Sequence, residues 1–152
     1  MPDPLSLSAK SARLGLPFLY SGQSQKEVFV NEALVRIDAL LHCIVEGVQN
    51  APPASATTGK VWLVGTAPTG DWADQANRLA VRQEQGWIFL EPSNGMRVLN
   101  GLTGQDMRRI DGAWISASAP AVPTTGTVAD AELRQAFADL ISSLREAGIF
   151  AQ

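Results

Sequence analysis

Hydrophobic residues recur with a helical period over residues 24–48. The apolar positions follow alternating steps of four and three, which places them on one face of a helix. Ser24 and Glu27 fit a capping box at its start, and Gly47 followed by the Pro52-Pro53 pair ends it. The face consists of Val30, Leu34, Ile37, Leu41, Ile44 and Val48, with Ala33 and Leu40 widening it. We predict a long amphipathic helix whose apolar face is buried.

Short apolar runs separated by turn residues replace this period between residues 60 and 116. Asn-Gly and Asp-Gly pairs lie between several of them, and such pairs are typical of tight hairpins. The runs are residues 60–64, 79–82, 86–90, 96–99 and 114–115. The predicted fold class is α+β: a long N-terminal helix packed on a small antiparallel β-meander, plus a separate C-terminal helix.

The C-terminal part begins with a segment rich in proline, threonine and alanine at residues 117–128, which indicates a linker. A second helix is predicted over residues 129–147, with Thr127 or Asp130 as its N-cap and Gly148 as its C-cap. Its apolar stripe has the spacing of a coiled-coil seam and is formed by Leu133, Phe137, Leu140 and Leu144. A helix this short is marginal alone, so it must pack on its own sheet or on other copies.

These patterns divide the chain into four segments. Pro17 keeps the residue before it extended, which indicates an N-terminal arm rather than a helix. The predicted segments are an extended arm at 1–22, a helix-plus-meander domain at 23–116, the linker at 117–128 and an oligomerisation helix at 129–152.

Composition narrows the classes of function. The chain has 152 residues, of which 45% are hydrophobic, and a net charge of −3, so a folded core is expected and nucleic-acid binding is not. No apolar run approaches the roughly 20 residues of a membrane span. The first residues lack the basic start of a signal peptide. We expect a soluble protein made in the cytoplasm, with no membrane insertion.

The reactive side chains predict no catalysis. His42 and Cys43 are the single histidine and cysteine, and as neighbours on a helix their side chains diverge by about 100°. They form neither a catalytic pair nor a metal site, so Cys43 is interpreted as a small buried hydrophobe. The carboxylates are scattered and interpreted as solvated or capping; Asp71 and Asp74 lack the spacing of a calcium loop. The prediction is a protein that is not an enzyme and has no catalytic residues, no metal and no cofactor.

All four tryptophans lie in the predicted β region, and they support two interpretations. Trp62, Trp72, Trp87 and Trp114 could form the core of a small sheet. Alternatively, Trp72 and Trp87 form a platform on which sugar rings stack, as in a carbohydrate-binding module.

Several segments resemble one family. They are residues 13–19 (RLGLPFL), 22–26 (GQSQK) and 31–40 (NEALVRIDAL), and the match continues at residues 59–65, 70–73 and 86–92. Together they resemble the uncharacterised domain found in tailed phages of alphaproteobacteria and in their gene transfer agents, among host-recognition and spike proteins. The resemblance covers about residues 13–116.

The resemblance implies a structural component of a phage-like particle, and it carries no catalytic residues. Because the chain is short, it favours the base or adaptor of a head spike that takes part in host attachment. The implied partners are copies of the same chain and other particle proteins such as the capsid or a spike fibre. Five copies are favoured over three, with the stripe from Leu133 to Leu144 as the subunit interface. The protein would be made in the bacterial cytoplasm and released as part of the particle.

A second hypothesis belongs to another class of function. It is a carbohydrate-binding module that recognises host capsular polysaccharide through Trp72 and Trp87.

Overall fold

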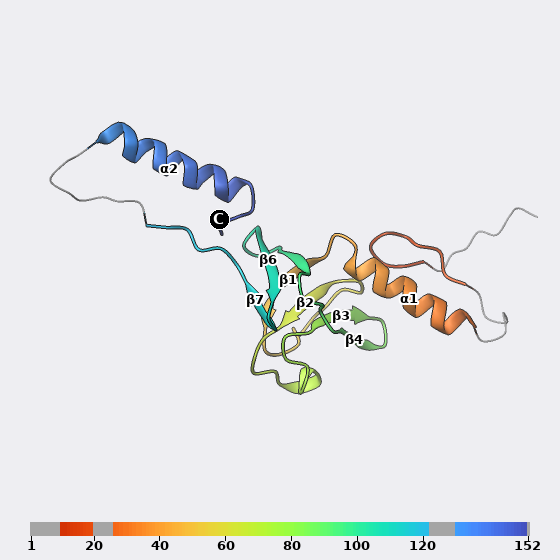
Figure 1. Cartoon of the computed structure of the whole chain (residues 1–152). Helices are drawn as coiled ribbons and strands as arrows, with labels where there is room; N and C mark the ends of the chain where they lie inside the picture. The colour runs from red at the N-terminus through yellow and green to blue at the C-terminus, as the bar shows by residue number, and fades with distance from the viewer. Residues whose placement is uncertain (1–9, 20–25, 122–129, 152) are drawn as a thin grey trace, which may run out of the picture. The chain divides into compact units, whose positions relative to one another are not determined.

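A computed structural model describes residues 10–19, 26–121 and 130–151 (Figure 1). Along the sequence of these residues, one α-helix precedes seven strands and a second α-helix follows them. The elements are α1 Lys26–Leu40, β1 Ile44–Gln49, β2 Val61–Val64, the 3-10 helix η1 Gly70–Trp72, β3 Leu79–Gln83, β4 Gly86–Leu90, β5 Arg97–Asn100, β6 Gln105–Ile110, β7 Ala113–Ile115 and α2 Ala131–Glu146. The strands form one mixed sheet in the order β4-β3-β2-β1-β5-β6-β7.

The chain divides into two compact units. The first runs to Cys43 and resumes over Val48–Glu91, so it contains α1, β2, β3 and β4. The second consists of Ile44–Gly47 and the chain from Pro92 onward, so it contains β5, β6, β7 and α2. Strand β1 is shared, because its first four residues belong to the second unit.

The first unit buries both faces of β2 and of the first three residues of β3. Val61 pairs with Val81 and Trp62 with Ala80, and side chains alternate between faces along a strand. One face carries Trp62 and Ala80 against the fully buried Trp72 of η1. The opposite face carries the pair of valines, each 1% exposed. Burial on both sides explains why these strands are continuous apolar runs.

In the second unit, β1 lies parallel to β5 and the other pairs are antiparallel. The residues that follow α2 are fastened to β6: the Asp106 amide donates to the Gly148 carbonyl over 2.8 Å, and the Gln105 side chain donates to the Ile149 carbonyl over 2.8 Å. Of the two predicted N-caps of the last helix, Asp130 is the one observed, since its side chain accepts the Leu133 amide at 2.9 Å. The C-cap is Ala147, and Gly148 after it takes the predicted left-handed conformation, with a φ of 72°.

The predicted long helix over residues 24–48 is wrong. The helix ends at Leu40, His42 takes a left-handed φ of 51°, and the chain continues as β1. The β-branched residues Ile44, Val45 and Val48 favour a strand, in which Val45 is fully buried. The apolar residues that predicted one continuous helix therefore belong partly to helix α1 and partly to strand β1.

The predicted fold class, a long helix packed on a small antiparallel meander, is also wrong. All five predicted runs contain strands, but β1 and β6 join them and the β1–β5 pair makes the sheet mixed. Strand β6 was missed because its inward positions include Gln105 and Arg109, which are polar yet buried.

Some expectations fall on parts of the chain that the structure does not describe. Residues 1–9 of the arm, Ser24 of the capping box, Thr127 and most of the linker lie outside the described residues.

Replacing Trp72 by alanine should lower the free energy of unfolding by about 3–5 kcal/mol, because the indole is fully buried and its removal leaves a cavity. Chemical denaturation monitored by circular dichroism measures this change. Leu102→Ala is the control, since Leu102 is 78% exposed and its loss should cost under about 0.5 kcal/mol. Equal effects of the two substitutions would contradict the placement of Trp72.

Candidate functional site

A buried carboxylate organises the N-terminal part of the first unit. Asp38 is 4% exposed and accepts three hydrogen bonds from the loop of residues 10–19. They come from the Ser11 hydroxyl at 2.7 Å, the Arg13 amide at 2.9 Å and the Leu14 amide at 2.5 Å. Carboxylate oxygens that accept several donors tolerate burial, because the bonds replace lost water. We call Ser11, Arg13, Leu14 and Asp38 the Asp38 lock.

The Arg13 side chain completes this lock at the end of α1. Its guanidinium donates to the carbonyl oxygens of Asp38 at 2.6 Å, Ala39 at 3.0 Å and His42 at 3.0 Å. The last carbonyl groups of a helix lack hydrogen-bond partners within the helix. A cation at this end is also stabilised by the helix dipole. The loop therefore determines where α1 ends.

The loop also packs closely on the strand side of the unit. Gly59 has a φ of 85°, and a Cβ built there would lie 2.5 Å from the Cβ of Ala12. Only glycine fits both the backbone conformation and this contact. The loop of residues 10–19 is thus held both to α1 and to the segment that leads into β2.

A cavity of about 870 Å³ lies between this loop, α1 and the β3–β4 hairpin. Its wall includes Phe18, Val35, Val81 and Ile88. The lining also includes Trp87 and the charged residues Lys10 and Glu84. The cavity therefore offers both apolar and polar surface.

The two tryptophans predicted to contact glycans have different environments. Trp72 is 0% exposed and belongs to the core. The half-buried Trp87 ring lies edge-on to Trp72 and Trp62, with centroid distances of 5.1 and 5.5 Å. The Arg82 guanidinium is 5.4 Å from the Trp87 ring centroid. The structure thus brings Trp72 and Trp87 together within a cluster of aromatic side chains.

His42 and Cys43 are adjacent after the end of α1 and lie in different surroundings. His42 is exposed, whereas Cys43 is buried. Burial raises the pKa of the Cys43 thiol to about 11, and the charge of Arg13 opposes part of this rise. Among the described residues, no three His, Cys, Asp or Glu side chains form a group able to hold a metal ion.

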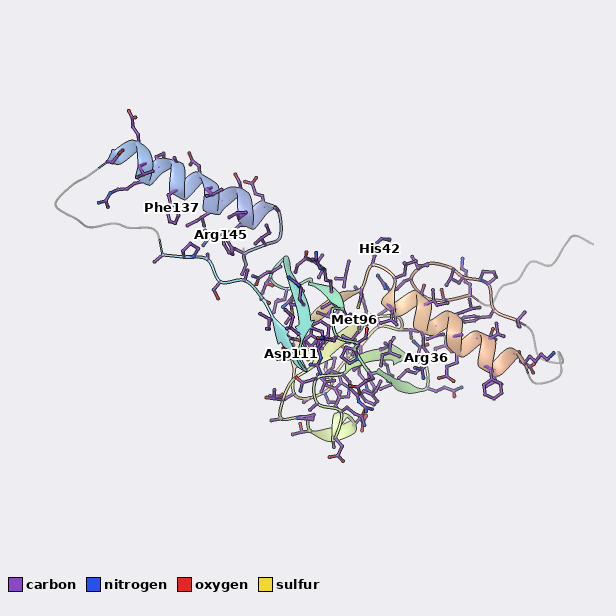
Figure 2. All side chains as sticks on the ribbon, in the orientation of Figure 1. Arg36, His42, Met96, Asp111, Phe137 and Arg145 are labelled. Carbon is purple, nitrogen blue, oxygen red and sulfur yellow. The ribbon has the colours of Figure 1, made fainter. Side chains whose placement is uncertain are left out.

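The predicted interface stripe of α2, to which the Phe137 labelled in Figure 2 belongs, is incompletely buried. Leu133 is 66% exposed and Leu140 is 53% exposed, while Phe137 and Leu144 are half-buried. The residue that α2 buries most deeply is Ile141, which lies next to the stripe at 4% exposure. The helix thus uses one edge for its own unit and leaves the other edge uncovered.

The apolar face predicted to be buried in the first helix is largely exposed. Ile37 and Val30 are 50% and 40% exposed, and Phe29 beside them is 77% exposed. The side that α1 buries is centred instead on Asp38 and Ala39. Sequence reasoning missed the role of Asp38 because it grouped this carboxylate with the solvated acids. The available signal was that Asp38, unlike the other acids of the helix, stands directly between Ile37 and Ala39.

The described residues define a domain built on a mixed sheet, with a buried carboxylate lock and two helices that keep apolar surface exposed. Residues 30–115, more than half of the chain, match the family described as "Protein of unknown function (DUF2793)", and the chain belongs to this family. No curated protein matches the sequence. The family description names no function, so an origin in phages or gene transfer agents stays a prediction.

In the part of the chain that the structure describes, neither helix has the length and apolar character needed to cross a bilayer.

Replacing Asp38 by alanine should destabilise the fold, because buried donors of the loop lose their acceptor. A donor left unsatisfied costs about 1–3 kcal/mol. Denaturation should report this loss, and amide hydrogen exchange should show reduced protection at Arg13 and Leu14. Glu32→Ala is the control, since Glu32 pairs with Arg36 on an exposed surface. Unchanged exchange at the two loop amides would contradict the lock.

The Cys43 thiol should react slowly with iodoacetamide at pH 8, because the thiolate is the nucleophile and a pKa of about 11 keeps the thiol neutral. Mass spectrometry should show fast alkylation only after denaturation. The neutral thiol should contribute stability that is present below pH 9.0, the ordinary pKa, and lost as the pH rises toward 11. A native rate equal to the denatured rate would contradict this assignment.

Proposed function

We propose that this protein is a structural component of a phage-like particle such as a gene transfer agent, as the base or adaptor of a spike that takes part in host attachment. The resemblance of residues 13–19, 22–26 and 31–40 to such proteins motivates the proposal. Two of these segments supply the Asp38 lock, through Arg13, Leu14 and Asp38. The resemblance therefore includes residues that hold the fold together.

The observation that carries the proposal is the uncovered edge of α2. Leu133 and Leu140 lie seven residues apart on one side of the helix and are more than half exposed. Burying a leucine side chain contributes roughly 1.5–3 kcal/mol. Repeated subunits bury such an edge when they close around a symmetry axis. A ring of copies joined through this edge is the assembly we favour, with five copies at a capsid vertex ahead of three in a fibre.

The role we propose is assembly without catalysis or a cofactor. His42 and Cys43 have different environments, one exposed and one buried. The carbohydrate-binding alternative stays a prediction that depends on Trp87, since Trp72 has no exposed surface.

The edge of α2 is tested by placing charges on it. Leu133→Asp combined with Leu140→Asp should release monomers without unfolding the chain, because both side chains are already exposed. Phe137→Asp combined with Leu140→Asp should do the same, at some cost to packing since Phe137 is half-buried. Light scattering measures the mass, and circular dichroism confirms the fold.

The matched control is Gln135→Asp combined with Ser142→Asp, which adds the same charge at other exposed positions of the helix. This control should keep the wild-type mass. A monomeric wild-type chain, or an unchanged mass in the leucine variant, would overturn the assembly role of α2.

The particle role is tested by comparing particles from cells with and without the gene. Electron microscopy should show a spike density that disappears with the protein, and adsorption to host cells should fall. Particles of unchanged structure and adsorption would refute the role.

A further inference from the structure

Arg109, near the end of β6, is a buried cation without a counter-charge. Its side chain is 9% exposed, and its Nη1 atom is enclosed without a hydrogen-bond partner. Among the described residues, no carboxylate forms an ion pair with this guanidinium. Arginine side chains stay protonated in proteins, and buried charges are normally paired. The described part of the chain therefore leaves one buried positive charge uncompensated.

A second buried polar side chain on the same strand is fully partnered by the fold. Gln105 is 6% exposed and points to the same face as Arg109, since side chains alternate along a strand. Its amide donates to the Ala117 carbonyl over 2.5 Å and to the Ile149 carbonyl over 2.8 Å. The fold thus supplies acceptors for a neutral amide on this face and none for the charged group four residues later. This contrast indicates that the acceptor for Arg109 comes from another molecule.

The surroundings of the guanidinium are apolar and lie close to the protein surface. Arg109 pairs with Trp114 across β6 and β7, and its guanidinium carbon is 5.8 Å from the centroid of the indole ring. Met107 precedes it on the same face and is 9% exposed. Trp114 is only half-buried, so the stacked pair reaches the surface. An anion that binds beside the indole meets the guanidinium in a medium of low dielectric constant, where charge pairing is strong.

Two further arginines raise the positive potential at this end of the sheet. Arg97 and Arg108 are direct partners across β5 and β6, and both are exposed. They lie on the face opposite to Arg109, because Arg108 is its neighbour in the strand. Like charges that face each other across two strands are unfavourable. This end of the sheet therefore attracts anions, and the buried guanidinium gains most from one because salt screens it least.

The chemistry of the site selects a carboxylate. The planar fork of a guanidinium matches the two oxygens of a carboxylate and also those of a phosphate. A carboxylate neutralises one guanidinium, whereas a phosphate group carries about −1.5 to −2 charges and leaves an excess in an apolar site. We propose that Arg109 and the Trp114 ring form a binding site for the carboxylate of another molecule. The site lies on the sheet and does not involve α2, so it stands apart from the proposed assembly.

NMR titration of the full-length, isotope-labelled protein tests the site, with sodium acetate as the probe. The Nε–H signal of Arg109 and the indole N–H signal of Trp114 should shift saturably with acetate, and not with sodium chloride at the same ionic strength. Arg109→Met should weaken the response of Trp114 at least about tenfold, because the charged hydrogen-bond donor is lost. Arg97→Met is the matched control: it removes an exposed arginine from the opposite face and should respond like the wild type.

Thermal denaturation separates a binding role from a structural one. Without carboxylates in the buffer, Arg109→Met should raise the melting temperature, because an apolar side chain replaces an unpaired buried charge. Arg109→Lys keeps the charge but not the planar fork, so it should fold and respond more weakly to acetate. A lower melting temperature of Arg109→Met, together with an unchanged response of Trp114 to acetate, would show that Arg109 only supports the fold.

Two further probes identify the source of the carboxylate. Tighter binding of an acetylated and amidated Ala-Glu-Ala peptide than of acetate would assign the site to an acidic side chain of a protein partner. Equal binding of the peptide and acetate would assign it to a small free carboxylate. Tighter binding of inorganic phosphate than of acetate would overturn the choice of a carboxylate. The absence of a saturable response to all of these probes would overturn the site itself.

Discussion

The buried carboxylate of Asp38 is the interaction on which the first unit depends. It holds the amides of Arg13 and Leu14, and the Arg13 guanidinium in turn satisfies the last carbonyls of α1. Both buried oxygens keep hydrogen-bond partners, because each accepts from the loop. Because these hydrogen bonds satisfy carbonyl groups near the end of α1, the helix ends at Leu40 and the chain continues into β1. The length of the helix is therefore a tertiary property.

Several apolar residues of the short helix α1 lie outside the core. Asp38 and Ala39 face the unit, and the side that carries Ile37 and Phe29 is left exposed. On the strands, Trp72 and the valines of β2 and β3 form the buried core of the first unit. The described residues of the chain leave this apolar surface exposed.

The two helices thus present similar chemistry in different units. Each buries one side and exposes a row of aliphatic side chains spaced by seven residues, Val30 with Ile37 on α1 and Leu133 with Leu140 on α2. The assembly role that we propose for α2 rests on its exposed row.

The sequence by itself determined the last helix and five of the strands, because a 3.6-residue period, caps such as Asp130 and Gly148, and apolar runs between turn residues are local signals. It also determined the family, through residues 30–115. Only the tertiary structure decided the rest. The end of α1 depends on Arg13, 25 residues before Asp38, and β6 exists because its buried Gln105 finds carbonyl partners far along the chain. Which side of a helix is buried depends on such distant partners, and periodicity alone contains no record of them.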